Sequence, residues 1–342
     1  YSLDNNKSSI ISFLAPSADI EKTETEARTK SMSVISHVYN QMNNIIPGNI
    51  GRYNDDFNIN KIIIISSKIC KILMIRSCLV ISMTQKELLY NRGYKSNLII
   101  GIKNDNNVRA RPQSGPQNAD AVFEVLVEGG MTRLINIFYE SDTSYHGPIR
   151  SARPTDPTVL RPLDGVLVAS GATGGLIPEI IDMGVPVITD RRPEFFRISS
   201  RSAPHNLYAD TYKLKNLAIS KGYKKTNNPQ PLFPWGNPNI NSWANGKSIK
   251  LKFSSATTTT WTWNGSNYVR TYYDAYKGSS SGNPHNWINE NGSSGQIAVP
   301  TVIALMCEPY MHPLQLPSVK TVGEGRAIIM HGGKMLDAKW KR

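Results

Sequence analysis

The sequence predicts an α/β domain with a mostly parallel or mixed sheet, followed by a smaller β-rich domain with mostly antiparallel strands. Between residues 97 and 225, short apolar runs suited to buried strands alternate with helical patterns. From residue 247 to residue 342 the helical patterns stop, and strand patterns take their place. Residues 226–246 are rich in Pro and Asn, and we expect them to form a linker or a long surface loop.

The elements of the first domain are predicted in chain order from these patterns: strand 98–103, helix 119–128, strand 131–139, short helix 155–163, strand 165–170, helix 174–183, strand 185–189 and helix 209–221. The helix at 119–128 rests on apolar residues at helical spacing, with Asn118 as its N-cap. The second domain is predicted to contain strands 248–254, 257–264, 267–273, 296–306, 325–331 and 335–340, with a flexible connection at 278–295.

Residues 1–96 are expected to be largely irregular or poorly ordered. Within them the apolar segment 59–83 is interrupted by four basic residues, Lys61, Lys68, Lys71 and Arg76. Each would cost about 2.5–3.5 kcal/mol at the centre of a bilayer, so a spanning helix is not predicted. The segment could instead be an export signal with a lipid on Cys78, although Arg76 fits such a signal badly and the apolar stretch is short. The alternatives are a partly buried helix or a misread upstream region.

Composition limits the classes of function. The chain has 342 residues, of which 39% are hydrophobic and 19% charged, as in an ordinary globular protein. Its net charge of +13 favours anionic partners, but the basic residues are scattered and no nucleic-acid-binding module is present, so nucleic acid is not predicted as a partner. Three cysteines give no disulfide framework, and the histidines lack ligand spacing, so neither a metal nor a cofactor is predicted.

An acidic stripe marks the predicted helix at 119–128. Asp120, Glu124 and Glu128 recur every four residues. Like charges at this spacing repel one another unless cationic groups pair with them. Arg111 and Arg133 lie in the flanking turns, and arginine suits bidentate pairing with carboxylate or phosphate. The alternative interpretation is a solvated acidic helix face.

Two more arginines, Arg150 and Arg153, lie in the run GPIRSARP just before a predicted helix start. Backbone N–H groups and the helix dipole favour an anion at such a place. The alternative is an internal Arg–Glu network that braces the fold.

Two turns complete the predicted site. Ser170 and Gly171 follow a buried strand, where α/β proteins bind ligands, but their run is not a phosphate-binding, dinucleotide-binding or nucleophile motif. A plain tight turn is the alternative there. His205 and Asn206 lie in a turn before a helix, and His205 could pair with a carboxylate for acid–base chemistry or serve as a structural histidine.

Together these residues predict a charged cleft that binds an anionic or sugar-like ligand, lined by Arg111, Gln113, Asp120, Glu124, Glu128, Arg133, Arg150, Arg153, Ser170, Gly171, His205 and Asn206. The alternative function is a hydrolase that cleaves a glycosidic or phosphoester bond of an envelope polymer. Its candidate acid and base are Glu124 or Glu128 with His205. A third interpretation is a structural module in which these charges satisfy only one another.

Five motifs, KNDNNVRARPQSG, ADAVFEVLVEGGMTR, GPIRSARP, VASG and APHNLY, resemble in this order the YerB-like bacterial family, a two-domain group described as lipoproteins. The resemblance is specific over residues 97–210 and continues more weakly to residue 342, where the chain is expected to stop before the family's final strands. It implies an extracytoplasmic, membrane-anchored bacterial protein. The partner expected from the charged cleft is an anionic or glycan-like small molecule or a cell-wall component, and Cys78 is a candidate site for a peripheral lipid anchor. The resemblance implies no reaction.

Overall fold

The computed structural model describes residues 78–83, 98–190, 193–223, 238–274 and 282–342. The predictions for residues 1–77 and 84–97, and for most of the linker, lie outside these residues. The end of the apolar segment was wrongly predicted as part of an irregular extension, because Cys78–Met83 form strand β1.

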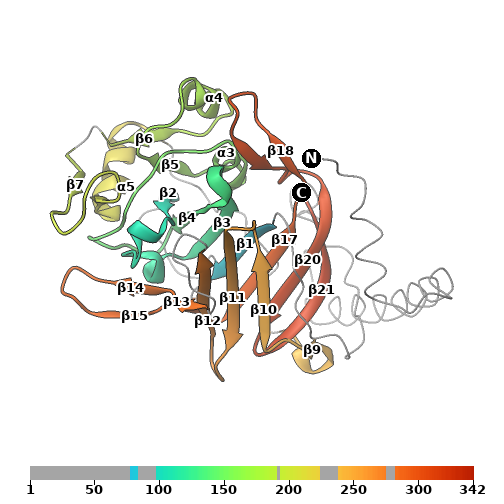
Figure 1. The fold of residues 1–342 in the computed structure, drawn as a ribbon. Helices are drawn as coiled ribbons and strands as arrows, with labels where there is room; N and C mark the ends of the chain where they lie inside the picture. The colour runs from blue at the N-terminus through green and yellow to red at the C-terminus, as the bar shows by residue number, and fades with distance from the viewer. Residues whose placement is uncertain (1–77, 84–97, 191–192, 224–237, 275–281) are drawn as a thin grey trace, which may run out of the picture.

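Ten strands form one large sheet in the order β6-β5-β2-β4-β3-β1-β17-β20-β21-β9 (Figure 1). Only β2, β5 and β6 run parallel to one another, and every other pair is antiparallel. The predicted mixed sheet followed by antiparallel strands is therefore confirmed. The strand bounds are β1 Cys78–Met83, β2 Ile100–Asp105, β3 Ala121–Leu126, β4 Thr132–Phe138, β5 Val166–Ala169, β6 Val187–Thr189, β9 Ala244–Asn245, β17 Thr301–Met306, β20 Glu324–His331 and β21 Lys334–Lys341.

The large sheet is continuous through both predicted domains. Strand β1 pairs with β3 of the first domain on one side and with β17 of the second domain on the other. Backbone hydrogen bonds therefore join the two parts across the middle of the sheet.

Helices cover both faces of the parallel part of this sheet, and three of them were predicted nearly as observed: α3 Thr155–Leu160, α4 Leu176–Asp182 and α5 Thr211–Ser220. Leu160 and Ile180, from α3 and α4, belong to the apolar core on one face. Leu214 and Ala218, from α5, belong to the core on the other. Among the described helices, none combines the length and the apolar character needed to cross a membrane.

The predicted helix at 119–128 is wrong, since these residues form strand β3. Strands β1 and β4 pair with β3 on both sides, so neighbouring strands satisfy its backbone groups. Val122, Phe123 and Val125 suit a strand buried on both faces, and tertiary pairing decided against the helical spacing.

A second sheet packs its apolar face on the antiparallel half of the large sheet, and β10, β11 and β12 lie in front of it in Figure 1. Trp261 and Tyr268 contribute to the core between the two sheets, opposite Val302 and Ile328. The bounds of this sheet are β10 Ser248–Lys252, β11 Thr257–Trp263, β12 Tyr268–Asp274, β13 Asn283–Pro284 and β16 Ala298–Val299.

Short two-stranded ribbons complete the fold. They are β7 Phe195–Arg197 with β8 Leu207–Ala209, β14 Asn286–Ile288 with β15 Ser294–Gln296, and β18 Pro309–Met311 with β19 Pro317–Val319. The predicted flexible connection at 278–295 is corrected where it is described, because it contains β13, β14 and part of β15.

Candidate functional site

The pleat of β3 and β4 divides the predicted site residues between the two faces of the large sheet. Glu124 is paired across the strands with Leu134, and its neighbour Val125 is paired with Arg133. Because successive side chains of a strand point to opposite faces, Glu124 and Arg133 face opposite sides. The single cleft predicted from the sequence is therefore wrong for these residues, which form two separate networks.

The first is the inter-sheet network, which consists of Asn106, Arg111, Gln113, Glu124, Arg270 and His285. The buried Glu124 carboxylate accepts hydrogen bonds from Arg270 Nη2 at 2.7 Å and from Asn106 Nδ2 at 3.3 Å. Thr132 Oγ1 donates to the same carboxylate oxygen at 2.7 Å. Glu124 thus joins the large sheet to β12 of the second sheet.

His285 extends this network to the loop before β3. Arg270 donates to His285 Nδ1, so the ring must carry its proton on Nε2 and donate it to Gln113 Oε1 at 2.5 Å. Burial lowers the pKa of His285 well below its usual value, and the charges of Arg270 and Arg111 lower it further. His285 is therefore neutral at pH 7, as this pattern requires.

Arg111 and Gln113 are held in place by the same network. Gln113 Nε2 donates to Asn106 Oδ1 at 3.0 Å, and Arg111 Nε donates to the same oxygen at 3.1 Å. The Arg111 guanidinium also lies 3.8 Å from the ring centroid of Tyr272. Burial lowers the pKa of Arg111 to about 10, with a further contribution from Arg270.

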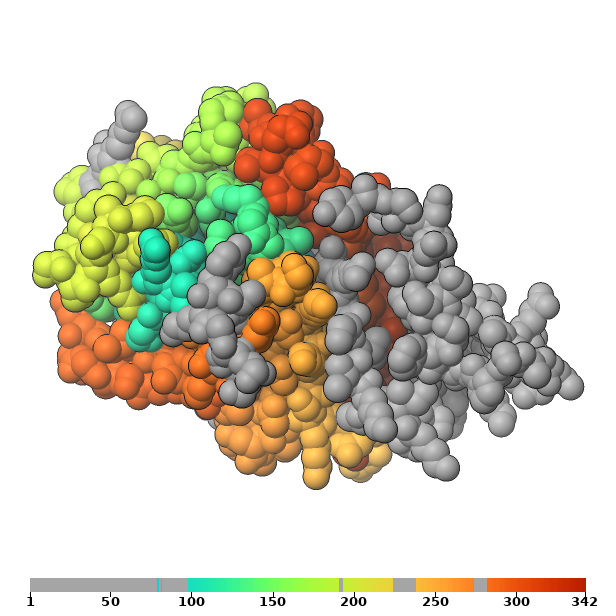
Figure 2. Space-filling view, in the orientation of Figure 1, coloured from blue at the N-terminus to red at the C-terminus, as the bar shows by residue number. Residues whose placement is uncertain are grey.

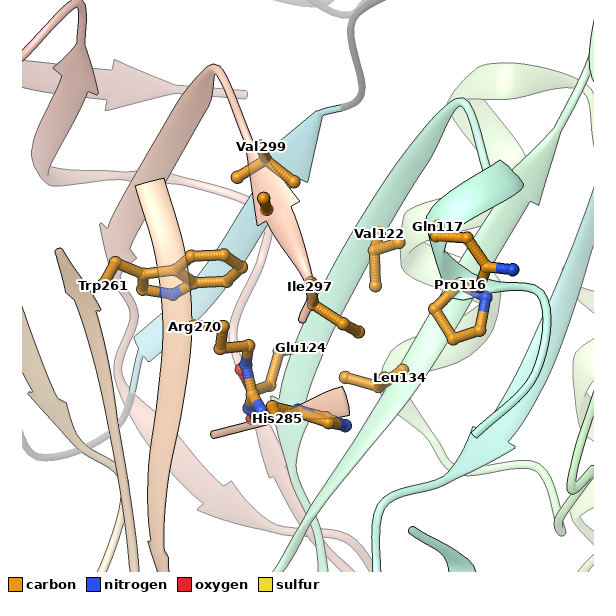
Figure 3. A pocket seen from close by; sticks show the side chains of 11 residues that line it. Pro116, Gln117, Val122, Glu124, Leu134, Trp261, Arg270, His285, Ile297 and Val299 are labelled. Atoms are coloured by element: carbon orange, nitrogen blue, oxygen red, sulfur yellow. Dashed lines mark hydrogen bonds and ion pairs between the residues drawn. The ribbon is translucent and has the colours of Figure 1, made fainter. Parts of the chain in front are cut away.

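A mostly apolar pocket adjoins this network between the two sheets. Figure 3 shows Glu124, Arg270 and His285 together at one end of it, with Trp261 and Val122 among its other lining residues. Neither Glu128 nor Arg150 lines this pocket.

The second is the edge network, which consists of Lys103, Asp105, Glu128, Arg133, Arg150, Arg153, Asp156 and His205. Its centre is Asp105, the last residue of β2, at the carboxyl edge of the parallel strands where open α/β sheets bind ligands. Asp105 Oδ2 lies 2.6 Å from His205 Nδ1 and 3.3 Å from Arg150 Nε. At the ends of β5 and β6 along the same edge, Ser170 Oγ donates to Asp190 Oδ2 at 3.0 Å.

Glu128 lies between two arginines in the edge network. Its Oε1 is 3.0 Å from Arg133 Nη2, and its Oε2 accepts from Arg153 Nε at 2.6 Å. Arg133 Nη1 also donates to the carbonyl of Ser151 at 2.8 Å. Burial lowers the pKa of Arg133 to about 10, and the charge of Arg150 lowers it further.

Lys103 and Asp156 form a completely buried ion pair in the interior of the edge network, with 2.5 Å between Lys103 Nζ and Asp156 Oδ1. Burial lowers the pKa of Lys103 to about 8, although Asp156 opposes the shift. The edge network therefore contains four Lys and Arg side chains against three carboxylates. The side chains of this network that reach solvent most are Glu128, at 37% exposed, and Arg150, at 27% exposed.

Two predicted residues stabilise turns instead of joining either network. Asp120 Oδ2 accepts backbone hydrogen bonds from Tyr139 at 2.6 Å and from Glu140 at 2.9 Å. Asn206 Oδ1 accepts from Arg197 at 2.8 Å, and its Nδ2 donates to two carbonyls of the same turn.

Gly171 lies at the carboxyl edge, as predicted. Its φ of +66° favours glycine, and its carbonyl accepts from the N–H of Ala152 at 2.9 Å.

Sequence reasoning missed six residues of the two networks: Lys103, Asp105, Asn106, Asp156, Arg270 and His285. The run Lys-Asn-Asp-Asn at 103–106 directly follows an apolar run, and charge at the end of a buried strand was the available signal. No local pattern marks Arg270 or His285, because they reach the site only through the packing of the second sheet. In the described ranges, no group of His, Cys, Asp and Glu is arranged to hold a metal ion.

Comparison with known proteins agrees with this architecture. Residues 89–224 match the family described as "Protein of unknown function (DUF3048) N-terminal domain", and residues 249–342 match the C-terminal domain of that family. The "Putative lipoprotein YerB" of Bacillus subtilis (strain 168) is 32% identical over 136 residues, which are 39% of this chain and 41% of that protein. The match thus spans about two fifths of the relative's length.

The crystal structure of the YerB protein from Bacillus subtilis has the same fold, with a TM-score of 0.59 and 20% sequence identity. The superposition covers 73% of this chain and 84% of the YerB chain. The resemblance inferred from the five motifs is confirmed, and the chain belongs to the DUF3048 family, in which an N-terminal and a C-terminal domain of unknown function follow one another.

Proposed function

We propose that this protein is an extracytoplasmic binding protein of the cell envelope, and that the edge network binds an anionic group of an envelope component. The observation that carries the proposal is the excess of one positively charged side chain over the carboxylates in this network. Arg150 shares the single carboxylate of Asp105 with His205, and part of its side chain faces solvent. Arginine in such a position can form a bidentate pair with a carboxylate or a phosphate.

Position in the fold supports the same function. The carboxyl ends of β2, β5 and β6 bring Asp105, Ser170 and Asp190 to one edge of the sheet. The glycine turn that follows β5 leaves open space around Gly174, where an added Cβ would meet no atom within 4 Å. Ligands of open α/β sheets approach at this edge.

The inter-sheet network supports a structural role better than a binding role. The carboxylate of Glu124 is buried and receives three hydrogen bonds from protein groups. We assign this network to holding the second sheet against the large sheet, which leaves the edge network as the candidate for ligand binding.

The envelope location is extended to this chain from the relative, whose name describes a lipoprotein. A lipid on Cys78 would be attached at the first residue of β1, which pairs with Met306 inside the large sheet. Such a lipid would therefore lie directly beside the folded domain. Mass spectrometry of the protein purified from membranes would identify the lipidated residue.

Ligand-induced thermal shifts test the binding function. We expect inorganic phosphate or an acidic oligosaccharide to raise the melting temperature of the native chain, and the Arg150→Gln variant to lose this shift. Arg109→Gln is the matched control, because Arg109 is an exposed arginine of the neighbouring short helix Val108–Ala110. Loss of the shift in both variants, or in neither, would contradict the proposal.

A hydrolase is the second candidate function, and the Asp105–His205 pair favours it. The carboxylate lies 2.6 Å from His205 Nδ1 and would hold the ring with its proton on that atom, so that Nε2 could act as a general base. The carboxylate partner of His205 is therefore Asp105, instead of Glu124 or Glu128. Turnover of cell-wall fragments by the native chain but not by a folded His205→Gln variant would place hydrolysis ahead of binding.

A further inference from the structure

A cluster of three aromatic rings lies at the surface near the edge network. The ring centroid of Tyr145 is 4.6 Å from that of Tyr208 and 6.0 Å from that of Phe196. The ring planes differ by only 32–38°, so the three rings face in similar directions. Tyr208 is completely buried, whereas Phe196 is 37% exposed and Tyr145 is partly exposed. We call these three residues the aromatic platform.

Strand pairing explains why Phe196 faces outward. Phe196 is paired with Tyr208 across the β7–β8 ribbon, and the alternating neighbours Phe195 and Leu207 enter the apolar core. The ribbon therefore buries Phe195 and Leu207 on one face and exposes Phe196 on the other, while Tyr208 on that second face is completely buried. Phe196 does not belong to that core, and together with the partly exposed Tyr145 beside it forms an aromatic surface open to solvent.

Two charged side chains, Arg201 and Glu290, lie near the platform. Arg201 is held by the carbonyls of Ala110 and Pro112, and Figure 2 shows this early segment, in teal, beside the yellow-green residues around 200. Burial raises the pKa of Tyr145, and the negative charge of Glu290 raises it further. The positive charge of Arg201 lowers the same pKa. Both charged side chains therefore act on the Tyr145 ring.

The platform is continuous with the edge network along the chain. The N–H of Ile149 donates to the carbonyl of Leu207 at 2.7 Å, and His146 forms an antiparallel bridge with Ala209. Arg150 lies five positions after Tyr145 in the chain, a span of at most roughly 17 Å for extended chain. A ligand of a few sugar rings could therefore contact both places.

We propose that the aromatic platform is a subsite for a pyranose ring, and that the ligand of the edge network is an acidic glycan. The C–H groups on the apolar face of a pyranose would stack on Phe196 and Tyr145, because the face of an aromatic ring carries partial negative charge. The acidic group of the same glycan would pair with Arg150. This inference rests on the proposed binding function and adds the chemical class of the ligand.

Isothermal titration of the full chain with two hexasaccharides tests the proposal. Hyaluronate hexasaccharide supplies alternating glucuronate and N-acetylglucosamine, and chitohexaose is its neutral counterpart. We expect hyaluronate hexasaccharide to bind more tightly, and Phe196→Ala to weaken its binding about tenfold. Tyr310→Ala is the matched control and should bind as the native chain does, because Tyr310 is 36% exposed on β18, outside the platform.

A second variant guards against a folding defect. Phe196→Leu keeps an apolar side chain on β7 but removes the aromatic face, and it should weaken binding to a similar extent as Phe196→Ala. Unchanged melting temperatures for both variants would attribute the loss to the ring itself.

The remaining outcomes separate the two proposals. If Arg150→Gln abolishes hyaluronate binding and both Phe196 variants bind normally, the platform proposal is overturned and the binding function stands. Binding of inorganic phosphate without binding of either hexasaccharide would also overturn the glycan inference alone. If Phe196→Ala weakens both hexasaccharides equally and Arg150→Gln weakens neither, the pyranose subsite stands, and both the acidic pairing and the proposed anion site are overturned.

Discussion

Individual buried charges in this protein are stable only as members of their networks. Glu124 and Arg270 are both almost fully buried, and they come from strands of different sheets. A buried ion pair contributes little net stability compared with apolar residues, but loss of one partner leaves the other charge without compensation. Single substitutions of charged residues in either network are therefore expected to destabilise the fold.

Glu124→Gln should destabilise the fold by about 3–5 kcal/mol, because it leaves the Arg270 guanidinium buried without a carboxylate. Urea denaturation gives the free energy of unfolding. Glu308→Gln is the control, because Glu308 pairs with Lys320 at the surface and its loss should cost at most about 1 kcal/mol. Equal effects of the two substitutions would show that Arg270 is compensated by other groups.

His146 should make stability depend on pH. Burial lowers its pKa to about 3 from an ordinary 6.5, so the folded state disfavours the proton that the unfolded state binds. Above pH 6.5 His146 is neutral in both states and does not change the free energy of unfolding. Between pH 6.5 and pH 3 the unfolded state binds a proton that the folded state does not, so the free energy of unfolding falls by up to about 1.4 kcal/mol for each pH unit of acidification. The free energy of unfolding of His146→Gln should decline less steeply over this range. Identical slopes for the variant and the native chain would contradict the assignment.

At the scale of elements, the backbone of residues 146–149 packs closely against β8, and this contact positions Arg150 of the edge network. Residues 146–149 lie against β8, and an added Cβ on Gly147 would be 2.8 Å from the carbonyl oxygen of Leu207. Glycine is required there because the neighbouring backbone cannot move without breaking the pairing of β8.

Gly147→Ala should therefore cost about 1–3 kcal/mol of stability through overpacking. Gly174→Ala is the control, since nothing lies within 4 Å of its added Cβ, and its effect should stay within about 0.5 kcal/mol. Thermal unfolding of the two variants measures the difference. A neutral Gly147→Ala would mean that the segment can shift away from β8.

For the whole molecule, the continuous sheet predicts a single unfolding transition. Because β1 joins β3 to β17, the first domain cannot separate without breaking backbone hydrogen bonds. All six tryptophans lie beyond residue 225, and Trp261 in β11 and Trp263 at its end report on the second sheet. We expect tryptophan fluorescence and the amide protection of β2 and β4 to be lost at the same urea concentration, and two separate midpoints would contradict this expectation.

The local sequence determined most elements of this protein. The helices near 155–163, 174–183 and 209–221 were predicted within a few residues, because their apolar periodicity, turns and caps are local properties. The five motifs between residues 103 and 208, taken in order, also identified the family.

Only the tertiary structure decided the conformation of residues 119–128 and the partners of the charges. The four-residue spacing of Asp120, Glu124 and Glu128 suits one helix face, yet only Glu124 lies within strand β3. Asp120 precedes the strand, and Glu128 follows it in a short 3-10 helix. Pairing with β1 and β4 selected the strand, whose pleat then sent Glu124 and Arg133 to opposite faces. The partners of Glu124 come from up to 146 residues away, a separation at which local sequence patterns carry no information.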